Sequence, residues 1–229
     1  MSKLLEIENL FKVKAISKKY DVDIILENYW TKFSSLFPIV KKDTFISWIN
    51  EDTIGGWEES LDYNTGGRRE LILLYCTIRA SKPNKLLEIG THKGFSTKHI
   101  LLALQNNYNE NHICKIDTID IVNYDESNNL GNYPYNKITA NSLDYIKHNF
   151  DYDFVVQDGC HNFEHVDAEL KLLENFKSLK VFWAHDYHLN NNEVGKAIDS
   201  SNFLKSLDIF YDFKEVNYNA GFFIGKKIN

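Results

Sequence analysis

Residues 86–94, Leu-Leu-Glu-Ile-Gly-Thr-His-Lys-Gly, place two glycines directly after a short apolar segment. The apolar residues predict a buried strand, and a helix is predicted to begin soon after Gly94. Gly90 can adopt backbone angles closed to other residues, which lets the main chain approach a ligand closely. Amides at the start of the helix would face the same cleft, and Glu88 adds an acceptor there. A pocket of the nucleotide-binding type is therefore predicted at this turn.

Helical and extended patterns alternate along the rest of the chain. Helices are predicted at residues 69–81, 96–105, 142–148 and 163–179, and strands at 86–89, 113–121, 135–139, 154–157 and 181–184. Such alternation is typical of a parallel sheet covered by helices. Residues 210–216 and 220–225 have the pattern of an antiparallel hairpin. The expected fold class is thus α/β, with a Rossmann-like, doubly wound, mostly parallel sheet that ends in this hairpin.

The first third of the chain lacks this alternation. Residues 1–64 show mixed periodicity and contain Trp30, Trp48 and Trp57. We expect a helical cap or a dimerisation arm there, through which the protein would form a homodimer. The division predicted from the sequence is therefore 1–64 for this region and 65–229 for the α/β domain.

Composition excludes several classes of protein. The net charge of −6 without a long basic run argues against nucleic acid as a partner, since binding to phosphates needs clustered lysine and arginine. No apolar segment is long enough to cross a bilayer, so no membrane partner is expected. The three cysteines are scattered, without the close pairs of a metal site or disulfide framework. A cytoplasmic location is the expectation that follows.

Residues 87–97, Leu-Glu-Ile-Gly-Thr-His-Lys-Gly-Phe-Ser-Thr, resemble motif I of the class I S-adenosylmethionine (SAM)-dependent methyltransferases. The similarity is to the small O-methyltransferase-like group, of the methyltransferase family 24 type, and runs from about Arg68 to the C-terminus through four motifs in order. It implies SAM as the cofactor. It further implies transfer of a methyl group to an oxygen of a small molecule or sugar, with the cap and residues 187–192 lining the acceptor pocket.

The resemblance assigns the methionine end of the cofactor to Glu88, Gly90, Thr91 and Gly94. An acid at the end of the second strand can accept hydrogen bonds from both ribose hydroxyls. Asp120 is the preferred candidate because the apolar strand ends there, and Asp117 remains the alternative.

Asn141 and Ser142 follow the third predicted strand, where the related enzymes contact adenine. The Asn141 amide oxygen can accept a hydrogen bond from the exocyclic amine of adenine. Both residue types are also common helix N-caps, and the two roles are compatible.

The fourth and fifth strands are followed by Asp158-Gly-Cys-His161 and by Asp186. In the metal-dependent relatives, acids at these two places bind a divalent cation, and Mg²⁺ prefers carboxylate oxygens. Those enzymes have Asn after the second acid, whereas this chain has Tyr187, so metal dependence is left open. His161 or Asp158 would otherwise remove the proton from the acceptor hydroxyl, because the pKa of histidine suits general-base catalysis. Asp158 is also expected to contact the cofactor.

Two other classes of protein compete with this interpretation. An NAD-type oxidoreductase shares the layered fold, but its fingerprint needs a third, closely spaced glycine that this chain lacks. A non-catalytic cofactor-binding or interaction module would leave Asp158, His161 and Asp186 as solvated residues at strand ends.

Overall fold

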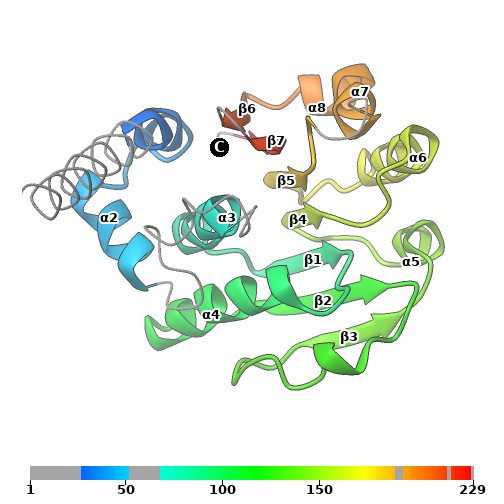
Figure 1. Cartoon of the computed structure of the whole chain (residues 1–229), viewed down its shortest axis with the longest axis horizontal. Coiled ribbons are helices and arrows are strands. Elements are labelled where there is room, and N and C mark those ends of the chain that lie inside the picture. The colour runs from blue at the N-terminus through cyan, green and yellow to red at the C-terminus, as the bar shows by residue number, and fades with distance from the viewer. Residues whose placement is uncertain (1–26, 52–67, 189–192, 216–217, 228–229) are drawn as a thin grey trace, which may run out of the picture.

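The computed structural model describes residues 27–51, 68–188, 193–215 and 218–227 (Figure 1). Residues 27–36 are helical. The helices that follow are α2 (Lys42–Glu51), α3 (Arg68–Ser81), α4 (Phe95–Asn109), the 3-10 helix η3 (Asp125–Ser127), α5 (Ser142–His148), α6 (Phe163–Leu173), α7 (Glu193–Ser200) and α8 (Asn202–Lys205). The strands are β1 (Lys85–Ile89), β2 (Lys115–Asp120), β3 (Asn136–Thr139), β4 (Phe154–Gln157), β5 (Val181–His185), β6 (Ile209–Glu215) and β7 (Tyr218–Lys226).

These strands form one seven-stranded sheet in the order β3-β2-β1-β4-β5-β7-β6. Neighbouring strands from β1 to β5 pair in parallel, whereas β7 pairs antiparallel with both β5 and β6. Strand order reverses between β1 and β4. In an open parallel sheet a ligand binds beyond the carboxyl ends of the strands at such a reversal. The expected doubly wound sheet with its C-terminal hairpin is confirmed.

Helices bury both faces of the sheet. Successive side chains of a strand point to opposite faces, so they divide between two hydrophobic clusters. Leu86 packs into one hydrophobic cluster and Leu87 into the other, and Val156 and Val155 divide in the same way. The first cluster includes side chains of α3 and α4, and the second includes side chains of α5, α6 and α7. Figure 1 shows these helices as two layers, one on each side of the sheet.

The described part of the N-terminal region packs into the first cluster. Phe33 and Phe45 are almost fully buried there, and the ring of Tyr29 stacks on Phe222 of β7 with 6.4 Å between centroids. Residues 27–51 therefore share a hydrophobic core with the sheet. The predicted boundary at residue 64 lies outside the described residues, so the division into two regions stays a prediction.

One predicted helix is too long. A helix was expected over residues 163–179, but α6 ends at Leu173. The Asn175 side chain donates to the carbonyls of Lys171 and Leu172, at 3.4 and 3.3 Å. An asparagine that binds nearby carbonyls in this way competes with continuation of the helix. Turns then lead the chain back to β5.

Candidate active site

A cavity of about 720 Å³ lies at the carboxyl ends of β1 to β5. Its lining includes seven of the residues predicted from the sequence: Gly90, Thr91, Asp120, Asn141, Ser142, Asp158 and His161. Glu88, Gly94 and Asp186 are not among the lining residues. Residues 189–192, expected to line the acceptor side, lie outside the described ranges.

Gly90 is where the main chain passes closest to the β4 loop. Its φ is +98°, and a Cβ atom placed there would lie 2.1 Å from the carbonyl oxygen of Asp158. Gly94, with a φ of +80°, occupies the N-cap position of α4, and a Cβ there would meet the side chain of Leu130 at 2.2 Å. Both positions therefore require glycine, for backbone conformation and for space.

Glu88 lies behind the cavity and is fully buried. Its carboxylate accepts hydrogen bonds from the hydroxyls of Ser96, Thr97 and Thr118, at 2.7, 2.7 and 2.6 Å. Burial raises the pKa of Glu88 to about 7, although the three hydroxyl donors act to lower it. This residue ties β1 to α4 and β2.

The two candidate acids on β2 have different surroundings. Asp120 lines the cavity and accepts hydrogen bonds from the amides of His92, at 2.7 Å, and Val122, at 2.9 Å. Asp117 accepts from the hydroxyls of Tyr145 and Tyr152 instead, on the side of α5. The structure thus brings Asp120, and not Asp117, to the cavity.

Asn141 is the N-cap of α5, because its side-chain oxygen accepts a hydrogen bond of 2.9 Å from the amide of Leu143. Ser142, the first residue of that helix, bonds to the ring of His165 on α6 at 2.9 Å. Exposed apolar side chains accompany these polar groups: Ile121 and Phe95 line the cavity and are 69% and 50% exposed.

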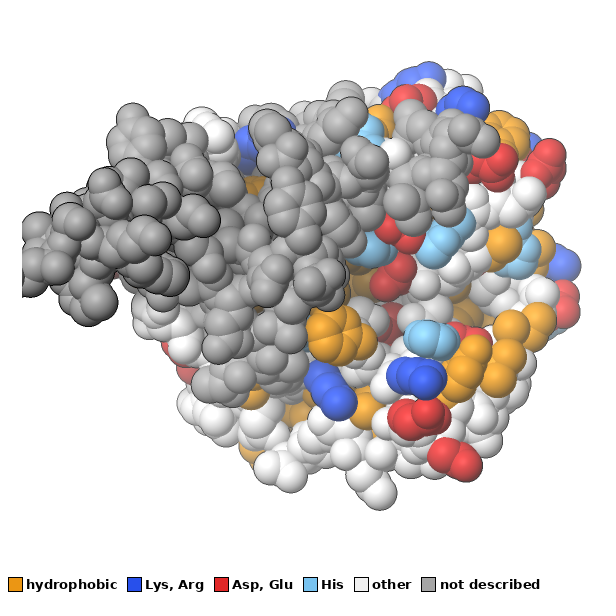
Figure 2. All heavy atoms as spheres, viewed as in Figure 1, with side chains coloured by type: hydrophobic (Ala, Val, Ile, Leu, Met, Phe, Trp, Pro, Cys, Tyr) orange, Lys and Arg blue, Asp and Glu red, His pale blue; other side chains and the backbone are white. Residues whose placement is uncertain are grey.

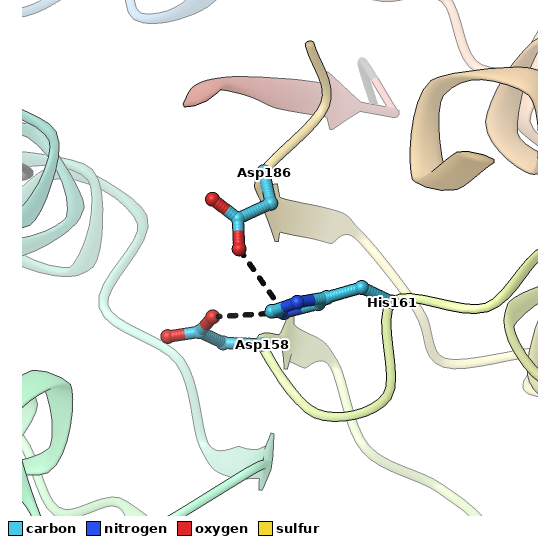
Figure 3. A group of neighbouring side chains, drawn as sticks. All are labelled: Asp158, His161 and Asp186. Atoms are coloured by element: carbon cyan, nitrogen blue, oxygen red, sulfur yellow. Dashed lines mark ion pairs between the residues drawn. The ribbon is translucent and has the colours of Figure 1, made fainter. Parts of the chain in front are cut away.

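Asp158, His161 and Asp186 meet where β4 and β5 end (Figure 3). Nε2 of His161 lies 3.1 Å from Oδ2 of Asp186 and 3.9 Å from Oδ1 of Asp158. Asp186 is buried and has a φ of +55°, a left-handed conformation that aspartate tolerates better than most residues. Acidic and histidine side chains are seen close together on the face shown in Figure 2.

His185 completes this cluster. Its Nδ1 lies 3.3 Å from Oδ1 of Asp158 and 3.0 Å from Oδ1 of Asp186, and its Nε2 lies 2.7 Å from Glu70. Burial acts to lower the pKa of His185, but hydrogen bonds with the three acids outweigh it and raise the pKa well above 6.5. The ring therefore places a positive charge among three carboxylates.

The other two pKa values follow from the same contacts. Burial acts to raise the pKa of Asp158, but the neighbouring rings of His161 and His185 outweigh this effect and lower it. Asp158 raises the pKa of His161 against the opposing effect of burial, and Asp186 adds to the increase.

Several neighbours of the cavity were not singled out from the sequence. Glu70 lies on α3, far along the chain from the strand ends that it joins, and His165 lies inside α6. Their sequence surroundings are ordinary amphipathic helices, so no local signal marks them. His185 is the last residue of β5, and its place at a strand end is the sequence signal that marks it.

Comparison with known proteins gives the class. Residues 87–186 match the family described as "Methyltransferase domain", methyltransferase family 24. No curated protein sequence matches the chain.

Three solved structures share the fold. An O-methyltransferase from Bacillus cereus in complex with SAH (S-adenosylhomocysteine) is 14% identical, with a TM-score of 0.53 over 88% of this chain and 100% of that one. The SAH-bound methyltransferase PaMTH1 from Podospora anserina is 15% identical, with a TM-score of 0.51 over 81% and 88%. The O-methyltransferase TomG from Streptomyces achromogenes, involved in tomaymycin synthesis and in complex with SAM, is 14% identical, with a TM-score of 0.50 over 85% and 94%.

The sheet order, the cavity at its reversal point and the family match over residues 87–186 are those of the class I methyltransferase fold. The identification made from the sequence is confirmed over residues 87–186, which match this methyltransferase domain family. Every helix in the described ranges is too short or too polar to cross a lipid bilayer.

Proposed function

We propose that this protein transfers the methyl group of SAM to a hydroxyl oxygen of a small molecule or sugar. The observation that carries the proposal is the meeting of Asp158, His161 and Asp186 beside the cavity at the strand ends. Methyl transfer needs an in-line nucleophile and a group that removes its proton, while the cofactor supplies the electrophilic methyl. An acidic and histidine-rich centre suits a hydroxyl nucleophile.

The cofactor would lie along the cavity with its ribose at Asp120. Each carboxylate oxygen of Asp120 accepts one hydrogen bond from a backbone amide. Each oxygen can accept a further hydrogen bond, so the two ribose hydroxyls could both donate to this side chain. Gly90 and Thr91 would approach the methionine end, since both line the cavity where β1 ends. Asn141 and Ser142 would face adenine, with the exposed Ile121 against the plane of the base.

Two predicted cofactor residues take indirect roles in this proposal. Glu88 supports the turn from behind through its three hydroxyl partners. Gly94 permits the start of α4. Asp158 lines the cavity beside Gly90 and would contact the methionine end as well as the reaction centre.

His161 is the proposed general base. Asp186 and Asp158 orient its ring and stabilise the imidazolium that forms when it takes the hydroxyl proton. Because the pKa of His161 is raised above its usual 6.5, the ring is mostly protonated at pH 6.5 and becomes the free base at higher pH. We expect turnover to increase with pH over that range in the wild-type enzyme and to be reduced at least 100-fold by His161→Gln, within the usual contribution of a general base.

A divalent cation is the alternative means of activation. Ligand atoms of Asp158, His161 and Asp186 lie within 4.8 Å of one another, so the residues fit one ion. Two carboxylates and one imidazole suit Mn²⁺ or another borderline cation as well as Mg²⁺. A bound cation would lower the pKa of a coordinated hydroxyl and fix its direction.

Metal dependence is tested by adding Mn²⁺ or Mg²⁺ to protein treated with EDTA. If the cation is used, calorimetry should show one site per chain that Asp186→Asn weakens, and turnover should return with the ion. Full turnover in EDTA would instead leave His161 as the base.

Cofactor binding is tested by titrating the protein calorimetrically with SAH. Wild-type protein should bind SAH, and Asp120→Ala should weaken binding by about tenfold or more, since hydrogen bonds to a charged group contribute about 1.5–3 kcal/mol. Asp125→Ala is the matched control, because Asp125 is exposed in η3 and does not line the cavity. No binding of SAH by the wild type would refute the proposal.

Catalysis is distinguished from cofactor binding alone by Asp158→Asn. An enzyme that uses this centre should keep its fold and lose methyl transfer to a panel of hydroxyl acceptors. A non-catalytic module would transfer no methyl group even as the wild type. The homodimer, the sugar acceptor and the cytoplasmic location stay predictions.

A further inference from the structure

A second histidine and carboxylate pair lies beside the cavity, outside the cluster of Asp158, His161 and Asp186. His165 of α6 places its Nε2 atom 3.1 Å from Oε1 of Glu169 and 2.9 Å from Oγ of Ser142. Ser142 and His165 line the cavity, whereas Glu169 is fully buried beneath them.

Glu169 determines which way these hydrogen bonds run. Its Oε2 accepts a long hydrogen bond of 3.4 Å from the side-chain amide of Gln157, so both carboxylate oxygens face nitrogen atoms. An unprotonated Nε2 would turn its lone pair toward this carboxylate, so the negative charge of Glu169 favours the form of His165 that carries a proton on Nε2. Glu169 also raises the pKa of His165 against the opposing effect of burial.

The proton on Nε2 also fixes the direction of the hydrogen bond between His165 and Ser142. A protonated Nε2 cannot accept a hydrogen bond, so the contact of 2.9 Å makes the hydroxyl oxygen of Ser142 the acceptor. The hydrogen of that hydroxyl is then free to be donated elsewhere. Ser142 is only 9% exposed, and the surface that it does show lines the cavity.

We propose that Glu169 and His165 are positioning residues that fix Ser142 as a hydrogen-bond donor to a ring nitrogen of the cofactor's adenine. This inference rests on the proposed function, since it needs the adenine at this end of the cavity. Adenine N1, N3 and N7 are all acceptors, so a fixed donor is complementary to any one of them. It would reject a purine that carries a proton at the same position, as hypoxanthine does at N1.

The test is a calorimetric comparison of SAH with its 1-deaza, 3-deaza and 7-deaza analogues. Each analogue replaces one ring nitrogen by a carbon that accepts no hydrogen bond. Wild-type protein should bind one of the three about fivefold to tenfold more weakly than SAH, as expected for loss of one hydrogen bond. Ser142→Ala should bind SAH more weakly by a similar factor and should no longer distinguish that analogue from SAH.

Ser200→Ala is the matched control, since Ser200 is exposed on α7 and its hydroxyl donates to the carbonyl of Ala197. It should keep the wild-type preference. If wild type and Ser142→Ala respond equally to all three analogues, the inference is wrong although the cofactor assignment stands. If wild type binds no SAH, the proposed function fails with it.

The role of Glu169 has its own test, independent of any ligand. Nitrogen-15 NMR of the wild-type protein should show a protonated Nε2 at His165, and an unprotonated Nε2 would overturn the inference. In Glu169→Met the negative charge beside Nε2 is gone, so Nε2 can lose its proton and accept from Ser142, and the preference among the deaza analogues should disappear. A preference that persists in folded Glu169→Met would also contradict it.

Discussion

Asp117 and Asp120 show what decides the role of a single residue in this site. They are three positions apart on β2, so their side chains leave the strand on opposite faces. Asp117 accepts hydrogen bonds from the two tyrosine hydroxyls near α5, whereas Asp120 lines the cavity. The sequence predicted the preferred acid because the apolar strand ends there. It could not exclude the other, because the strand boundary alone does not fix which face is which.

Gly90→Ala should damage the cavity more than its single added methyl group suggests. The new Cβ would lie 2.1 Å from the Asp158 carbonyl oxygen, and the φ of +98° disfavours any side chain. We expect a loss of roughly 1–3 kcal/mol in the free energy of unfolding and loss of SAH binding. Gly131→Ala, where the nearest atom is 3.7 Å away, should change neither in urea unfolding and calorimetry. Equal effects of the two substitutions would contradict this explanation.

Glu88 should make stability depend on pH. The ordinary pKa of a glutamate side chain is 4.5, which applies to the unfolded chain, and the pKa of Glu88 in the folded protein is about 7. Between these values the folded state holds a proton that the unfolded state has released, so the free energy of unfolding falls as pH rises. Relative to Glu88→Gln, the wild type should lose roughly 3 kcal/mol across this range.

Urea unfolding of both proteins at several pH values measures this difference. The hydroxyls of Ser96, Thr97 and Thr118 can donate or accept, so they can also bind the glutamine amide. A difference between the two proteins that does not change with pH would show that Glu88 keeps an ordinary pKa.

At the scale of helices and strands, the period of apolar residues was the most informative signal. The sequence placed α5 and β4 at their observed bounds, because Asn141 caps the helix and the strand begins with three apolar residues before Gln157. It extended α6 too far, because Asn175 interrupts the helix through side-chain bonds that a hydrophobic pattern does not register. The local pattern therefore predicted where α6 begins but not where it ends.

Arg79 connects three helices and should matter more than an ordinary charged residue. It is 3% exposed, donates to Asn107 at 2.6 Å and Glu110 at 2.5 Å, and lies 3.3 Å from Glu51 of α2. Arg79→Met should lower the free energy of unfolding by about 2–3 kcal/mol, chiefly because the buried Asn107 loses its donor. Lys82 also pairs with Glu110, but its side chain is 42% exposed. Lys82→Met removes that ion pair.

Lys82→Met should therefore cost less than about 1 kcal/mol, as exposed ion pairs do. Urea unfolding of the two variants beside the wild type makes the comparison. If both substitutions cost the same, the connection through Arg79 contributes no more than a surface ion pair.

At the scale of the whole molecule, the sequence predicted the fold class and the edge of the sheet that carries the cavity. Both follow from the alternation of elements and from the rule that the carboxyl ends of parallel strands share one edge. It did not predict that Glu70 joins His185, or that Glu169 supports His165. These pairs depend on how helices pack on the sheet, which no spacing along one segment encodes.

The central claim is that SAM binds along this cavity with its sulfur at the acid and histidine cluster. A crystal structure of the protein with SAH tests it most directly. We predict both ribose hydroxyls within hydrogen-bond distance of Asp120 and the sulfur facing Asp158 and His161. SAH bound elsewhere, or bound with its sulfur turned away from these residues, would contradict the account.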